Sequence, residues 1–309
     1  MDLRPIGGRP ASLVLRRLRD PGLQYGGWVM SLLRPAGRAG RQSHLTIAFP
    51  IPSPTDAKSL AAKLPSLMPC LARASDAIGT VHDSCFVVLS ERTLLFLADF
   101  DGDEVELLRD LAEHAGPVFD AVRAHVHRPP PEPAARNVDA FLEWAMHHRL
   151  RTVAAYAANP TATVRGIKSR VAAAHLRGTG EQLPFLVILP LRSRVSEEVF
   201  RVARGILADG SQSIGRLHFA SLVLLEDRKL GFFIIYDGPF DKFIPAFAEK
   251  LGPVFDLLFE FCVDPPPAPS AGNAGALIEW VVAHVLPPLG MYQAYPRLRV
   301  QDVSELEEA

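Results

Sequence analysis

One stretch of this chain occurs twice, and this repetition constrains the fold more than any other feature. Residues 78–103 read IGTVHDSCFVVLSERTLLFLADFDGD, and residues 214–239 read IGRLHFASLVLLEDRKLGFFIIYDGP. The two stretches align without a gap at an offset of 136 residues, which also pairs the proline runs at 129–133 and 265–269. Agreement over this length indicates an internal duplication, so the fold must contain the same structural unit twice.

Each repeat has the pattern of a strand, a helix, a β-hairpin, further helices and a last strand. In the first repeat the strands are predicted at 45–52, 81–89, 93–100 and 152–158, and in the second at 185–191, 217–225, 230–236 and 290–295. This order is the split βαβ, or ferredoxin-like, arrangement. The hairpin strands are apolar on both faces, so helices on one face leave another face to bury. We therefore predict an α+β fold in which two antiparallel four-stranded sheets face each other as a pseudo-symmetric barrel or sandwich, with a pocket between the layers.

Composition divides the chain into five segments. Residues 1–43 form a basic arm with eight arginines and two aspartates; the others are repeat A (44–160), a linker (161–182), repeat B (183–300) and an acidic tail (301–309), which we expect to be frayed. The arm is predicted to dock on a partner or a membrane surface, or to pack on its own domain or a second subunit. A homo-oligomer is therefore expected.

Charge and cysteine content narrow the possible partners. The formal net charge is −1, which gives no electrostatic case for binding nucleic acid. Three scattered cysteines favour a reduced, cytoplasmic protein over a disulfide framework. No apolar run is long enough to span a bilayer. A small-molecule substrate is the expected partner.

Short motifs in the repeats resemble a known group. The GTVH and DFDG sequences of repeat A, with GRLH and YDG of repeat B, are similar to tandem-repeat relatives of the dye-decolorising haem peroxidases in the dimeric α+β barrel superfamily. That superfamily also includes small cofactor-free monooxygenases. The resemblance implies haem as a cofactor. The chain departs from the motif where an arginine is expected after the histidine, because Cys85 and Ser221 stand there, and this puts peroxide chemistry in doubt.

The histidines are the main candidates for chemistry. His82 and His218 occupy equivalent places early on a strand and are candidate catalytic residues; His218 is also a candidate ligand of haem iron. His284, equivalent to His148 on a late helix, is the competing axial ligand that the resemblance implies. The structural alternative is that His82 and His218 are strand-end residues hydrogen-bonded to the backbone, and that His148 and His284 lie near helix C-termini, where the helix dipole favours a cation. Asp101, with Glu104, is predicted to cap the helix that follows it.

Three functions remain open from the sequence. The leading hypothesis is a haem-binding, peroxidase-like oxidoreductase. The first alternative is a non-catalytic binding or assembly protein on the same fold. The second alternative is a cofactor-free monooxygenase or isomerase that uses the pocket between the layers, with no cofactor at all.

Overall fold

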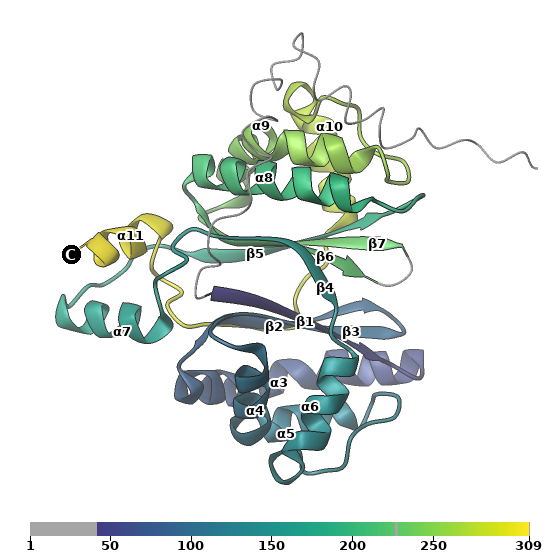
Figure 1. The fold of residues 1–309 in the computed structure, drawn as a ribbon, viewed down its shortest axis with the longest axis vertical. Helices are drawn as coiled ribbons and strands as arrows, with labels where there is room; N and C mark the ends of the chain where they lie inside the picture. Colours follow the sequence, from purple (N-terminus) through teal and green to yellow (C-terminus); the bar gives the residue numbers. More distant parts are fainter. Residues whose placement is uncertain (1–41, 226–227, 309) are drawn as a thin grey trace, which may run out of the picture.

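The structure, a computed structural model that describes residues 42–225 and 228–308, contains two antiparallel four-stranded sheets facing each other (Figure 1). This confirms the predicted fold class. Sheet A has the strand order β1 (Gln42–Pro50), β3 (Thr93–Asp101), β2 (Val81–Ser90) and β8 (Met291–Gln293). Sheet B has the order β4 (Arg151–Ala157), β6 (Leu217–Leu225), β7 (Lys229–Asp237) and β5 (Gln182–Pro190).

Helices form the two outer layers. Sheet A is covered by α3 (Pro54–Ile78), α4 (Glu104–His114), α5 (Gly116–Arg123) and α6 (Val138–His147); sheet B is covered by α8 (Glu197–Ile214), α9 (Phe240–Phe259) and α10 (Ala274–His284) (Figure 1). Single 3₁₀ turns, η1 (Ala134–Arg136) and η2 (Ser270–Gly272), precede α6 and α10. Helices α7 (Val164–Ala173) and α11 (Val300–Glu308) pack together beside the sheets (Figure 1).

The first helix of each repeat begins and ends with the same local chemistry. Ser53 and Ser196 are the N-caps of α3 and α8, and each side chain accepts a hydrogen bond from the backbone three residues later. Gly79 and Gly215 end these helices with φ of 70° and 64°, a left-handed conformation that glycine adopts without steric cost. The duplicated sequence thus specifies the same helix boundaries in both copies.

Each sheet takes its fourth strand from the other repeat, which the sequence did not predict. Strand β4 ends repeat A but pairs with β6, and β8 ends repeat B but pairs with β2. Before crossing, the chain pairs with its own repeat, because Leu150 N–H donates to Thr46 O at 2.8 Å and Leu286 N–H donates to Leu186 O at 2.9 Å. The crossing segments join the sheets at both edges into a flattened barrel.

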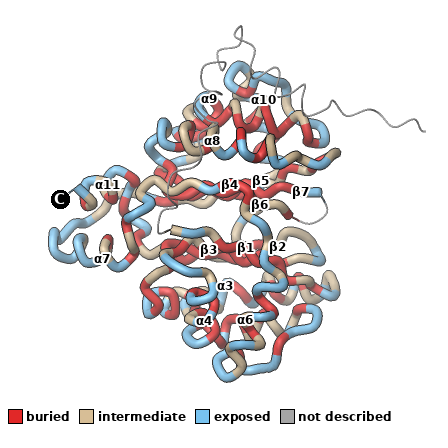
Figure 2. The backbone as a smooth tube through the Cα atoms, viewed as in Figure 1, coloured by how far each residue is buried: buried red, intermediate tan, exposed pale blue. Residues whose placement is uncertain are grey.

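Burial follows these layers (Figure 2). One apolar core lies between each sheet and its helices, and both are rich in phenylalanine. A smaller core lies between the sheets and is formed by Ala48, Cys85, Val87, Leu95 and Leu97 of sheet A with Leu186, Val223, Leu225 and Phe233 of sheet B. The space between the sheets is therefore partly filled by side chains and partly, as described below, by polar groups.

The repeats differ in one helix, and one local prediction is wrong. Helix α9 continues through Gly252-Pro253, whereas the equivalent Gly116-Pro117 separates α4 from α5. The acidic tail is not frayed, because residues 300–308 form α11, whose buried Val303 and Leu306 pack against α7. The packing of these apolar residues outweighs the acidic composition of the tail.

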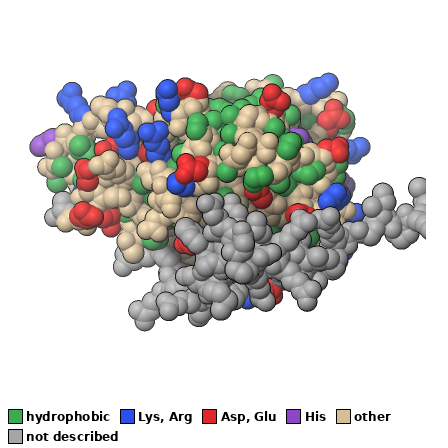
Figure 3. Space-filling view, turned by 90° about the horizontal axis from the view of Figure 1, so that it is seen from above, with side chains coloured by type: hydrophobic (Ala, Val, Ile, Leu, Met, Phe, Trp, Pro, Cys, Tyr) green, Lys and Arg blue, Asp and Glu red, His purple; other side chains and the backbone are tan. Residues whose placement is uncertain are grey.

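The basic arm, residues 1–43, is predicted to dock on a partner or a membrane surface. These residues lie almost entirely outside the described ranges. No helix among the described residues is long and apolar enough to cross a membrane. On the face formed by α8–α10, charged side chains of both signs are interspersed (Figure 3).

Candidate functional site

The two candidate histidines form equivalent ion pairs. His82 Nε2 lies 2.9 Å from Asp101 Oδ1, and His218 Nε2 lies 2.8 Å from Asp237 Oδ1. Both histidines are buried. Each aspartate is 19 residues after its histidine, on the neighbouring strand of the hairpin. The duplication therefore preserves a His–Asp pair in each repeat.

Each of these aspartates also caps a helix, but not the predicted one. Asp101 Oδ2 accepts a hydrogen bond from Val164 N at 2.8 Å, at the start of α7, and Asp237 Oδ2 accepts one from Val300 N at 2.8 Å, at the start of α11. The N-cap of α4 is instead Asp103. The predicted cap of α4 by Asp101 is therefore wrong, and Asp101 instead accepts from the first turn of α7, the helix after the crossing strand. The His–Asp pairs therefore fasten α7 and α11 to the sheets.

His82 lies between the sheets because of a β-bulge. Strict alternation of side chains along β2 would put it on the same face as Phe86, towards the helices. The pairing of β2 with β3 shifts between Val81 and Asp83, however, and this turns His82 to the other face. Its ring is 5.2 Å from that of Phe219 in sheet B, and its Nδ1 is 2.6 Å from Tyr295 Oη. His82 and His218 thus approach the same tyrosine, with ring separations of 5.7 and 6.4 Å.

These histidines do not fit haem. His218 is 4% exposed, and its Nε2 is already bonded to Asp237. His284 ends α10 in the outer helical layer, where its Nδ1–H donates to Trp280 O at 2.7 Å and its ring stacks on the indole at 4.0 Å. The two proposed ligands lie in different layers, and neither of them lines the cavities that the described residues form at the ends of the sheets.

A row of four polar residues crosses the inner face of sheet A. His44 on β1 is opposite Asp99 on β3, Asp99 is opposite Asp83 on β2, and Asp83 is opposite Gln293 on β8. Residues directly opposite each other in antiparallel strands share one face, so these four side chains are neighbours. His44 Nδ1–H donates to Asp99 Oδ1 at 2.9 Å. We call His44, Asp99, Asp83 and Gln293 the polar row.

The equivalent row in sheet B is apolar. It consists of Pro184 on β5, Ile235 on β7, Phe219 on β6 and Ala157 on β4. Sheet B therefore forms the same fold without a polar side chain at these four positions. A structural role common to both repeats explains the His–Asp pairs, but it does not explain the polar row.

Electrostatics mark Asp83 as the unusual member of the row. Its pKa is raised well above the ordinary value, first because it is buried and then because the Asp99 carboxylate lies beside it. Its Oδ2 has no hydrogen-bond partner among the described residues. Such a buried, unpartnered oxygen costs about 1–3 kcal/mol. Burial also raises the pKa of Tyr295, and the nearby carboxylates raise it further.

His44 connects the row to the opposite sheet. Its Nε2 lies 2.9 Å from Thr46 Oγ1 and 3.2 Å from Ser221 Oγ of sheet B. Ser221, His44 and Asp99 thus have the hydrogen-bond order of a nucleophile, a base and an orienting carboxylate. Ser221 is 2% exposed, however, and Thr46 shares the same nitrogen, so the serine is not placed to attack an ester or amide. The arrangement holds and orients an imidazole.

A cavity of about 650 Å³ opens at the Gln293 end of the row. Gln182 and Gln293 line it, and Gln293 Nε2–H donates to Gln182 O at 3.2 Å. Gly178 forms part of the wall, and a Cβ at that position would lie 2.2 Å from Arg297 O. Only glycine permits this close approach, so the wall depends on it.

Sequence reasoning identified the duplicated histidines but missed the polar row. The missed signal was a difference between the copies: Asp83 and Asp99 are replaced by Phe219 and Ile235 at the offset of 136. A carboxylate within an apolar strand is unusual, and its absence from the second copy shows that the fold does not need it.

Comparisons with known proteins give a distant likeness only. No family model matches the sequence, and no curated protein sequence is significantly similar. Among solved structures, the chain is similar to a protein of Fusobacterium nucleatum subsp. nucleatum provisionally named a monooxygenase (8% identity, TM-score 0.42, covering 85% of this chain and 98% of that one). A Lactobacillus acidophilus protein with the same provisional name has 7% identity, a TM-score of 0.38 and coverages of 83% and 99%. An anthrone oxidase-like protein has 11% identity, a TM-score of 0.31 and coverages of 84% and 95%. This likeness is too distant to indicate a function.

Proposed function

We propose that the protein is a cofactor-independent oxygenase whose acid–base group is the polar row. The observation that carries this proposal is the asymmetry between the repeats: one sheet places two carboxylates and an imidazole where the other has Pro184, Ile235 and Phe219. Buried groups with a shifted pKa beside a specific charge partner are typical of active sites. Asp83 has these properties, since its pKa is raised beside Asp99 and its Oδ2 is unpartnered among the described residues.

The row supplies a base and an acid close together. Asp99 accepts from His44 Nδ1–H and so leaves Nε2 as the candidate basic atom of the ring. Burial and the charge of Asp99 raise the pKa of Asp83, so this carboxyl group holds its proton more tightly than an ordinary one and is the candidate acid. The charge of Asp99 beside it favours the protonated form of Asp83.

This pair of groups suits a substrate with an acidic C–H bond next to a carbonyl group. Removal of that proton gives a carbanion that reacts with O₂, and the resulting hydroperoxide loses water to give a ketone. For a methylene group the balance is R₂CH₂ + O₂ → R₂C=O + H₂O. The substrate supplies the electrons, so the reaction needs no external reductant.

The cavity beside Gln293 supports access by such a molecule. Its volume of about 650 Å³ lies within the usual range for small-molecule sites. Gln293 lies directly opposite Asp83, so a ligand in this cavity approaches the row from its β8 end.

The test is oxygen uptake by the purified protein with anthrone, a tricyclic ketone with an acidic methylene group, without added cofactor. We expect uptake above the spontaneous rate and a loss of about 100-fold or more in kcat in Asp83→Asn, as for removal of an acid–base group. The control is Asp139→Asn, whose side chain is 94% exposed on α6. Equal rates in wild type and Asp83→Asn, or no uptake with a set of such ketones, would contradict the proposal.

The second candidate is a non-catalytic binding protein on the same fold. The burial of Asp83, which is 6% exposed, and of Ser221, which is 2% exposed beside His44, favours it. The two candidates differ in a measurable way. A binding protein would retain a ligand of this class without consuming oxygen, and Asp83→Asn would change its affinity alone.

A further inference from the structure

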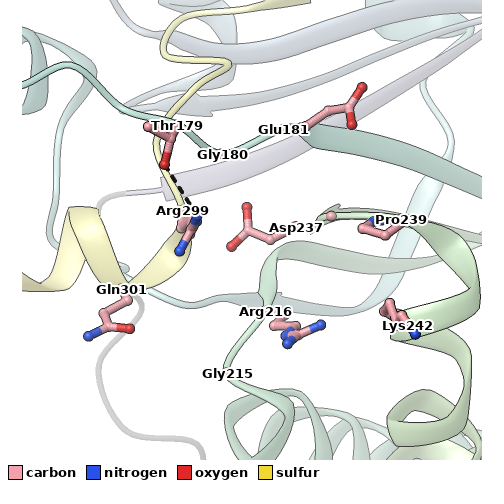
Figure 4. A pocket seen from close by; sticks show the side chains of 11 residues that line it. Thr179, Gly180, Glu181, Gly215, Arg216, Asp237, Pro239, Lys242, Arg299 and Gln301 are labelled. Atoms are coloured by element: carbon pink, nitrogen blue, oxygen red, sulfur yellow. Dashed lines mark hydrogen bonds between the residues drawn. The ribbon is translucent and has the colours of Figure 1, made fainter.

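A second cavity lies at the end of sheet B and shares the 179–181 segment with the cavity beside Gln293. Its volume is about 560 Å³. Its walls come from the 179–181 segment, the start of β6, the end of β7, the first turn of α9 and the start of α11 (Figure 4). Four separate parts of the chain therefore converge on it, because the end of β7 and the first turn of α9 are continuous.

Three cations line this cavity. Arg216 precedes β6, Lys242 lies in the first turn of α9, and Arg299 precedes α11 (Figure 4). Among the described residues, no carboxylate lies within ion-pairing distance of Arg216 or Arg299. Lys242 Nζ is 3.9 Å from Asp241, and both side chains are more than two-thirds exposed, so this pair neutralises the ammonium only weakly.

The two acidic residues of the lining do not neutralise these cations. The Oδ1 atom of Asp237 is hydrogen-bonded to His218 Nε2, and its Oδ2 accepts a hydrogen bond from the backbone N–H of Val300. The carboxylate of Glu181 points away from the three cations (Figure 4). The cavity therefore has an excess of positive charge.

Repeat A provides an internal comparison. At the offset of 136, Arg216, Lys242 and Arg299 are replaced by Thr80, Glu106 and Thr163. The cationic lining is thus another difference between the copies and is not required by the fold.

The starts of α4 and α9 also differ in charge, because only α4 is capped by a carboxylate. The Asp103 carboxylate caps α4 by accepting from Val105 N at 2.8 Å and from Glu106 N at 3.2 Å. Pro239 takes the equivalent place before α9, and no side chain caps that helix. Repeat A thus carries its own anion at this point, whereas repeat B has a cavity and cations there.

We propose that this cavity binds a phosphate monoester. Three cations match a dianion better than a monoanionic carboxylate, and the free N–H groups at the start of α9 supplement them. The volume of about 560 Å³ exceeds that of phosphate, so it accommodates an organic part as well. This site is separate from the polar row, and the proposal does not depend on the oxygenase activity.

The test is isothermal titration of the full-length protein at low ionic strength with inorganic phosphate, with ribose 5-phosphate and with acetate. We expect ribose 5-phosphate to bind more tightly than phosphate, and acetate to bind at least about 10-fold more weakly than phosphate. Arg216→Gln and Lys242→Gln should each weaken phosphate binding by about 10- to 100-fold, as for loss of a hydrogen bond to a charged group.

Two further variants separate binding from folding. The control is Arg201→Gln, an exposed arginine on α8 that pairs with Glu198, and its phosphate affinity should be unchanged. Pro239→Asp introduces the anion that repeat A has, so it should raise the unfolding midpoint and weaken phosphate binding by about 10-fold or more. No binding of phosphate to the wild type at millimolar concentration would overturn the proposal. Equal affinity in wild type, Arg216→Gln and Lys242→Gln, or equal affinity for acetate, would overturn it too.

Discussion

Replacing Asp83 by asparagine should stabilise the protein at neutral and alkaline pH. The native state raises the pKa of this carboxyl group, through burial and then through the charge of Asp99. In the unfolded chain the group has its ordinary pKa, near 4. Between these two values the folded state binds one more proton than the unfolded state. The free energy of unfolding therefore falls as the pH rises through this window.

The size of the effect follows from the site. Each unit of pKa difference corresponds to about 1.4 kcal/mol. A buried polar oxygen without a partner, as found for Asp83 Oδ2, costs about 1–3 kcal/mol. Asparagine carries no charge, and its amide N–H groups can donate to Asp99. We therefore expect Asp83→Asn to be more stable than the wild type by about 1–3 kcal/mol at about pH 8, and the difference to shrink towards about pH 4.

The assay is urea unfolding of both proteins at several pH values across this range. Asp139→Asn, at a side chain 94% exposed, is the matched control and should follow the wild-type curve. Parallel curves for wild type and Asp83→Asn would refute the reasoning, since they would mean that Asp83 has the same proton affinity in the folded and unfolded states. A stabilised but inactive Asp83→Asn would show that the row is kept for function at a cost in stability.

Two stability measurements and one measurement of cysteine reactivity test other parts of the structure. Asp101→Asn should destabilise the protein by about 2–4 kcal/mol in urea unfolding, because it weakens both the bond to its histidine and the cap of α7. Trp280→Phe should cost about 1 kcal/mol more than Trp144→Phe, because only Trp280 Nε1–H has a hydrogen-bond acceptor, the carbonyl of Asp264 at 3.0 Å. The Cys85 thiol should react with a thiol reagent only after unfolding, since burial and the neighbouring carboxylates raise its pKa.

The duplication made most of the fold predictable. Strand and helix order, the hairpins and the facing sheets follow from apolar patterns that occur twice at a fixed offset. The exchange of β4 and β8 did not follow, because a short apolar strand carries no signal of which sheet it joins. The bulge at His82 was missed for a related reason, since strict alternation cannot reveal an inserted residue.

The candidate site was less predictable than the fold. His82 and His218 attracted attention because both copies have them, and the structure gives both the same fastening role through Asp101 and Asp237. The groups proposed for chemistry are those that only one copy has. His44 and Asp99 become neighbours only through the pairing of β1 with β3, 55 residues apart, which no local pattern encodes.

The most direct test of the central claim is the protonation state of the polar row at neutral pH, measured by infrared spectroscopy. We predict a carboxylic acid C=O stretching band in the wild type at about pH 7, because the raised pKa of Asp83 keeps its carboxyl group protonated. The band should be lost in Asp83→Asn and retained in Asp139→Asn. A wild-type spectrum without a band that Asp83→Asn removes would mean that both carboxyl groups are ionised, and it would contradict the assignment of the row as an acid–base centre.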